Sequence, residues 1–153
     1  MHENRSVEHT VLSVEDLLQK NLILLASTTL QNGIQANPTS QALRLLEAEI
    51  ASKSRDFYAA APQYDVLLKD DPDNPSLLIK TAIAWSRLGE IDKAIRYSKR
   101  AAEKSQHSLH SVLTLADLYE RFNRTSEAEL ILNEMQEKPL LNGNYHRLIA
   151  RIL

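Results

Sequence analysis

The chain has 153 residues, of which 43% are hydrophobic, with a formal net charge of −2 and no cysteine. Its length suits one compact domain or a short helical array, and many helix-forming residues beside three glycines favour helices over a sheet. The lack of cysteine excludes disulfides and thiolate chemistry, and the slightly acidic balance argues against a general nucleic-acid binder.

The sequence of the first part of the chain predicts a polar tail followed by a pair of helices. Residues 1–10 are polar, so we expect a disordered tail there. Ser13, with Asp16 three residues later, has the spacing of a helix cap and predicts the start of the first helix. The apolar run at 22–25 continues into a second helix. The segment Asn37-Pro38-Thr39-Ser40 then predicts a turn and a new cap.

The rest of the chain predicts further pairs of short helices. They are expected at 41–53 and 58–69, on the two sides of the Leu88-Gly89-Glu90 turn, at 109–122 and at 126–136. Asn74-Pro75 opens the third pair, because proline is favoured at a first helical position. Pro62 lies in a first turn, where a missing N–H costs least, if its helix starts near Tyr58; if the helix starts earlier, we expect a kink. After Pro139, residues 145–153 start another helix.

Small residues return at a fixed interval of 34 residues. One column holds Ala26, Ala60, Ala94 and Ala128, and a second holds Ala48, Ala82, Ala116 and Ala150. Pro38 and Pro72 are separated by the same interval. Repetition in a single register predicts helical hairpins that pack against one another through small side chains.

The interval and its contents resemble the tetratricopeptide repeat family, in which a helix–turn–helix unit is about 34 residues long. The third unit carries the pattern most fully, with Ala82, Trp85, Leu88, Gly89, Ala94 and Ala101. The resemblance spans about residues 7–153 and implies an all-α, right-handed solenoid. Its units are expected at 7–40, 41–74, 75–108 and 109–142, with a partial fifth unit or capping helix at 143–153, in a single domain over 11–153.

A solenoid of this family has a concave face made mainly by the first helix of each unit, and the resemblance implies that a partner peptide binds there. Spacing along these helices places ten residues on that face: Leu45, Glu49, Lys53, Ile79, Ile83, Arg87, His110, Leu113, Asp117 and Arg121. The aliphatic members would form an apolar floor and the charged members a polar wall. The alternative is that these are ordinary solvated helix faces. Tyr64, Trp85 and Tyr119 are assigned to the core.

No catalytic, metal or cofactor site is predicted. His107 and His110 lie three residues apart without a convergent carboxylate, which makes a weak metal pair. The glycines are too widely separated for a phosphate-binding loop. The basic group within 96–104 is interpreted as a solvated outer face in preference to an RNA or lipid contact.

The sequence therefore favours a noncatalytic protein-interaction scaffold with a protein or peptide partner and no nucleic acid. The start of the chain has no apolar leader, and no apolar run approaches the roughly 20 residues that span a bilayer, so we expect a cytoplasmic protein without membrane insertion. A homodimer through the C-terminal helix is one option. Two alternatives stay open: a type III secretion chaperone, and the N-terminal repeat module of an enzyme such as a sulfotransferase or glycosyltransferase.

Overall fold

The computed structural model describes the backbone of residues 2–136 and the side chains of residues 5–134. The regular structure of this range consists of eight α-helices, which confirms the predicted all-α helical repeat fold. None of these helices combines the length and the apolar character that a membrane crossing requires.

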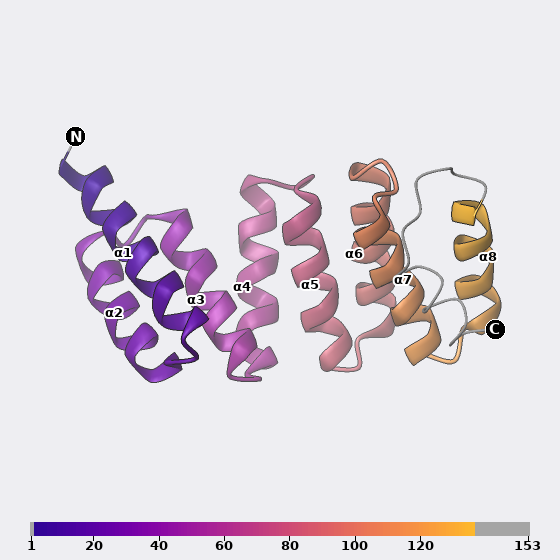
Figure 1. Ribbon diagram of the computed structural model, residues 1–153, viewed down its shortest axis with the longest axis horizontal. Coiled ribbons are helices and arrows are strands. Elements are labelled where there is room, and N and C mark those ends of the chain that lie inside the picture. The colour runs from indigo at the N-terminus through magenta and orange to yellow at the C-terminus, as the bar shows by residue number, and fades with distance from the viewer. Residues whose placement is uncertain (1, 137–153) are drawn as a thin grey trace. The chain divides into compact units, whose positions relative to one another are not determined.

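The helices group into two compact units that divide after Asp70. Unit 1 contains α1 (His2–Gln19), α2 (Ile23–Ala36), α3 (Gln41–Lys53) and α4 (Phe57–Asp70), and unit 2 contains α5 (Pro75–Arg87), α6 (Ile91–Lys104), α7 (Leu109–Arg121) and α8 (Thr125–Gln136) (Figure 1). Each unit holds two helical hairpins, and the first helices of the two hairpins pack together, α1 with α3 and α5 with α7. The single domain predicted over 11–153 stays a prediction.

The turn inside every hairpin has the same geometry. One residue has a left-handed backbone, with φ of 57° at Asn21, 63° at Arg55, 78° at Gly89 and 57° at Asn123. The N–H of the next residue donates to a carbonyl five positions earlier, at N···O distances of 2.9, 2.9, 3.1 and 2.8 Å in chain order. This pairing closes the end of the first helix. The four left-handed residues are 34 positions apart, so the turn follows the repeat.

Side-chain caps open the first helices of three hairpins at the same interval. Ser40, Asn74 and Ser108 precede α3, α5 and α7, and each side-chain oxygen accepts the backbone N–H three residues later. Pro75 follows Asn74 at the first helical position, which confirms the predicted Asn74-Pro75 start.

The two alanine columns lie in the core. Zero exposure is found at Ala26, Ala60, Ala94, Ala128, Ala48, Ala82 and Ala116, while Ala150 lies outside the described residues. Val14, which is 34 residues before Ala48, is equally buried. Because these side chains are small, the backbones of neighbouring helices can come close, as the sequence pattern predicted.

Glycine allows the closest approach in unit 1. A Cβ atom on Gly33 in α2 would lie 2.4 Å from Cγ2 of Thr10 in α1, a distance at which the Thr10 side chain or one of the two helices has to move. The missing side chain therefore lets α1 pack onto α2. Of the aromatic residues assigned to the core, Tyr64 and Tyr119 are buried, while Trp85 is half-buried with Nζ of Lys93 3.7 Å from its ring centre.

The predicted start of the first helix is wrong. α1 begins at His2, so Ser13 lies inside the helix, and most of the tail predicted as disordered over 1–10 is helical. The physical reason is that Val7 and Val11 pack against the core of unit 1, which extends the apolar face of α1 upstream of Val14.

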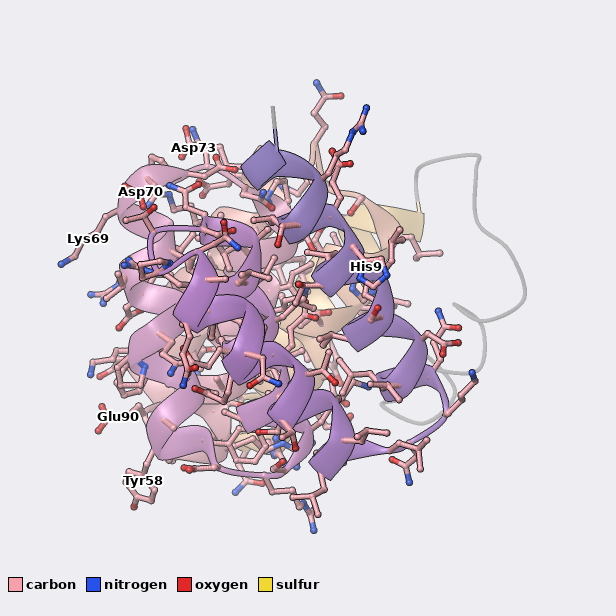
Figure 2. The ribbon with its side chains drawn as sticks, turned by 90° about the vertical axis from the view of Figure 1, so that its left-hand side faces the viewer. His9, Tyr58, Lys69, Asp70, Asp73 and Glu90 are labelled. Carbon is pink, nitrogen blue, oxygen red and sulfur yellow. The ribbon has the colours of Figure 1, made fainter. Side chains whose placement is uncertain are left out.

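The start of α4 also differs from the prediction. α4 begins at Phe57, where Asp56 caps it by accepting the N–H of Ala59 on Oδ1 at 3.1 Å. Pro62 is therefore the sixth helical residue, beyond the first turn, and because proline has no N–H it cannot donate to the carbonyl of Tyr58 four residues earlier. The Tyr58 side chain, 83% exposed, projects from the start of α4 (Figure 2). Pro139 and the fifth unit predicted at 143–153 lie outside the described residues.

Candidate functional site

The ten residues predicted for the partner-binding face are divided between the two units. Leu45, Glu49 and Lys53 lie on α3 of unit 1, where the first two are half-buried and Lys53 is exposed. The other seven lie on α5 and α7 of unit 2, namely Ile79, Ile83, Arg87, His110, Leu113, Asp117 and Arg121.

Five of the predicted residues lie on the first helices of unit 2, and we call this set the first-helix face. It consists of Ile83 and Arg87 on α5 and Leu113, Asp117 and Arg121 on α7. Nη1 of Arg121 donates to Oγ of Ser86 at 3.5 Å, which joins α7 to α5 at this face. Ile83 is 36% exposed and Leu113 is partly buried, while the three charged side chains are exposed.

The first-helix face can bind a group with mixed chemistry. Ile83 and Leu113 offer aliphatic surface, and the guanidinium groups of Arg87 and Arg121 can each hold a carboxylate through paired hydrogen bonds. Ile79 belongs to the packed interior, since it is only 6% exposed, and a partner would reach little of it. His110 is exposed in the first turn of α7.

On the unit 1 side, Glu49 lies beside a buried tyrosine. Burial raises the pKa of Tyr64, the negative charge of Glu49 raises it as well, and a hydrogen bond with the Ser52 side chain lowers it, which gives a net pKa of about 12. The phenol therefore stays neutral and acts as a core residue, as the sequence indicated.

The basic group of α6 lines a hollow of about 620 Å³ on the surface of unit 2. Asp73 sits at its edge and accepts hydrogen bonds from Nη2 of Arg100 at 2.8 Å and Nζ of Lys104 at 2.7 Å. These two bonds lower the pKa of the Asp73 carboxyl. Arg96 and Lys99 lie in the same hollow, with Asp92 and Glu103 among them, so the surface carries mixed charge.

Two further hollows occupy equivalent places in the repeat. One of about 350 Å³ lies between α6, α7 and α8, and one of about 310 Å³ lies between α3 and α4. Four residues that line the smaller hollow lie two repeat lengths before four residues that line the larger one. The pairs are Glu47 and Leu115, Pro62 and Leu130, Gln63 and Ile131, and Val66 and Glu134. These hollows were not predicted from the sequence, because each is lined by side chains from more than one helix, although the 34-residue repeat relates their positions.

No group of three histidine, aspartate or glutamate side chains that could hold a metal ion occurs in the part of the chain described here. His107 and His110 are both exposed.

A protein-family model described as tetratricopeptide repeat matches residues 86–152. Comparison with curated proteins gives no match. Among solved structures, a tetratricopeptide repeat protein from Parabacteroides merdae ATCC 43184 superposes with a TM-score of 0.79 at 18% identity, over 97% of this chain and 59% of its own. This chain thus spans 59% of that protein's length.

Two other structures have similar folds. MamA from Desulfovibrio magneticus RS-1, from residue 41 to its end, gives a TM-score of 0.78 at 13% identity, over 86% of this chain and 74% of its own. A chain of the APC/C hetero-tetramer Cut9–Hcn1 gives 0.78 at 19% identity, over 94% of this chain and 29% of its own. At these identities the likeness concerns the fold. Residues 86–152 match the tetratricopeptide repeat family by sequence, and the residues that the structure describes share the fold of solved tetratricopeptide repeat structures.

Proposed function

We propose that this chain is a noncatalytic protein-interaction module that holds a segment of a partner protein on the first helices of its repeats. The first-helix face of unit 2 carries the proposal, because it combines the exposed aliphatic side chain of Ile83 with the guanidinium groups of Arg87 and Arg121. The similar chain in the Cut9–Hcn1 hetero-tetramer supports it, since that fold occurs there within an assembly of several chains.

The chemistry of the face sets the kind of segment that fits. An aliphatic side chain of the partner would lie against Ile83 and Leu113, where its burial removes apolar surface from water. A neighbouring carboxylate would pair with Arg87 or Arg121, and Arg121 is held in position by its hydrogen bond to Ser86. The preferred segment is therefore short, with an apolar anchor beside an acidic residue.

Capture of partners by the immobilised full chain, with the captured proteins identified by mass spectrometry, tests the proposal. The double variant Ile83→Asp and Arg87→Glu places two negative charges on the face, so we expect it to retain less than about one tenth of the wild-type capture. The matched control is Ile91→Asp with Arg96→Glu, which makes the same changes at exposed positions of α6. Both variants are checked for unchanged helicity by far-UV circular dichroism.

Full capture by the Ile83→Asp and Arg87→Glu variant would show that the partner does not use this face. Equal loss in the α6 control would show that net charge, and not the face, decides capture.

A further inference from the structure

A second surface of unit 2 has the form of a binding groove. We call the hollow between α6, α7 and α8 the outer groove: Leu115 and Tyr119 form its floor, and Leu130 and Ile131 form one wall. The floor residues are buried, whereas Leu130 is 62% exposed. An exposed leucine at the edge of an apolar floor offers a place for aliphatic side chains of another molecule.

The outer groove is independent of the first-helix face. An α-helix turns by about 100° per residue, so positions two apart point to opposite sides of α7. Leu115 and Tyr119 line the outer groove, while Leu113, Asp117 and Arg121 belong to the first-helix face. A partner could therefore occupy one surface and leave the other free.

The rim of the outer groove has an acidic excess. It carries Glu103 of α6 and Glu127 and Glu134 of α8, beside Lys99 and His107. Glu127 is already engaged, because Nη2 of Arg124 lies 2.6 Å from its Oε1 and the bonded guanidinium lowers its pKa.

The other two carboxylates on the rim are available to a partner. Glu103 and Glu134 are exposed and have no ion-pair partner among the side chains that the structure describes. Two carboxylates on opposite walls thus border an apolar floor.

The equivalent hollow of unit 1 shows which features come from the repeat and which from the individual residues. There Pro62, Gln63 and Val66 stand where the outer groove has Leu130, Ile131 and Glu134. Helix packing therefore builds the hollow twice, but the leucine at its edge and the carboxylate of Glu134 on α8 are found in unit 2. The chemistry of the outer groove is specific to its position.

We propose that the outer groove of unit 2 binds a basic amphipathic segment of a partner protein. Aliphatic side chains of the segment lie on Leu130, Ile131 and the floor, and its lysine or arginine side chains pair with Glu103 and Glu134. The charge requirement is opposite to that of the first-helix face, which suits an acidic segment, so the two surfaces select different partners.

Fluorescence anisotropy with two labelled synthetic helical peptides tests this proposal on the full chain. One peptide has leucines on one face and lysines on the other, and the second replaces every lysine with glutamate. We expect the lysine peptide to bind at least about tenfold more tightly than the glutamate peptide, with the difference shrinking as salt is raised.

Charge reversal at the rim makes the test specific. The variant Glu103→Lys with Glu134→Lys should weaken binding of the lysine peptide by about tenfold or more and strengthen binding of the glutamate peptide. The control, Glu8→Lys with Asp70→Lys, makes the same change in net charge on unit 1 and should bind the lysine peptide as the wild type does. Asp70 lies at the end of α4, where its side chain projects away from the ribbon (Figure 2).

Two results would overturn the outer groove as the site. One is wild-type affinity for the lysine peptide in the Glu103→Lys and Glu134→Lys variant. The other is loss of this affinity in the Ile83→Asp and Arg87→Glu variant, since that would place the peptide on the first-helix face. Retained affinity in that variant supports the outer groove whether or not the first-helix face binds a partner.

Discussion

At the scale of single residues, Tyr64 is the position where burial and charge act together most strongly. Its side chain is 2% exposed in the core of unit 1, and the carboxylate of Glu49 raises the cost of ionising the phenol. The pKa of Tyr64 therefore rises from the ordinary value of 10.0 to about 12. A core residue with a shifted pKa makes stability depend on pH.

The raised pKa predicts a loss of stability in alkaline solution. In the unfolded chain Tyr64 loses its proton near pH 10, but in the folded chain it keeps the proton until about pH 12. Between these values the unfolded state binds fewer protons than the folded state, so the free energy of unfolding falls as pH rises. We expect a decrease of about 2–3 kcal/mol over this window, measured by urea unfolding at a series of pH values.

Tyr64→Phe is the control for this prediction, because it removes the ionisable group and keeps the ring. The other tyrosines contribute equally to both proteins, so the variant should lose the Tyr64 part of the alkaline decrease. The same pH dependence in both proteins would mean that Tyr64 is not the group responsible.

At the scale of the elements, the four hairpin turns use one backbone geometry with different residues. Gly89 adopts its positive φ without strain, and asparagine tolerates the same conformation at positions 21 and 123. Arg55 has no such tolerance, since its Cβ comes too close to a backbone oxygen in the left-handed region. The turn of the α3–α4 hairpin is therefore the strained member of the series.

Two substitutions at equivalent turn positions should have opposite effects. Arg55→Gly removes the strain, but glycine loses more backbone entropy on folding than arginine does. The net effect should be a stabilisation of the protein by about 0.5–1 kcal/mol. Gly89→Ala should destabilise it by about 1 kcal/mol. No atom lies within 4 Å of the added Cβ at position 89, so this cost comes from the backbone alone. Chemical unfolding of both variants measures the two effects, and a stabilising Gly89→Ala would contradict the proposed role of the turn.

Sequence reasoning predicted elements well where the chemistry of their ends was local. Asn74-Pro75 and Ser40 were recognised because a cap uses residues within one turn of the helix. The start of α1 was missed because Val7 and Val11 are held by contacts with the rest of unit 1, which no local signal shows. The turn at Arg55 was missed because arginine is not a residue that marks a left-handed position.

At the scale of the whole molecule, the candidate surfaces were less predictable than the fold. Helix periodicity placed Ile79 and Ile83 on one face of α5, and both residues lie there, yet only Ile83 is substantially exposed. The difference depends on how α5 packs against its neighbours, and that packing is decided by tertiary contacts. The outer groove needs side chains from three helices, so no single amphipathic pattern indicates it.

The repeat itself supplies the last prediction. Ala26, Ala60, Ala94 and Ala128 are fully buried at the same position of four hairpins, so the same substitution should have the same kind of effect at each. Leucine would overpack the helix interface and lower the free energy of unfolding by roughly 1–3 kcal/mol at every one of the four positions. Ala42→Leu, on the exposed start of α3, is the control and should change stability by less than about 0.5 kcal/mol.

Urea unfolding followed by circular dichroism measures the free energy of unfolding of all five variants. Fluorescence of Trp85, which packs against Ala82, Ala94 and Leu118, reports separately on unit 2. A side chain that gains three carbons in a filled interface has to displace its neighbours. An unchanged free energy of unfolding after leucine substitution at any of the four alanines would therefore show that the helix interface of that hairpin is not filled.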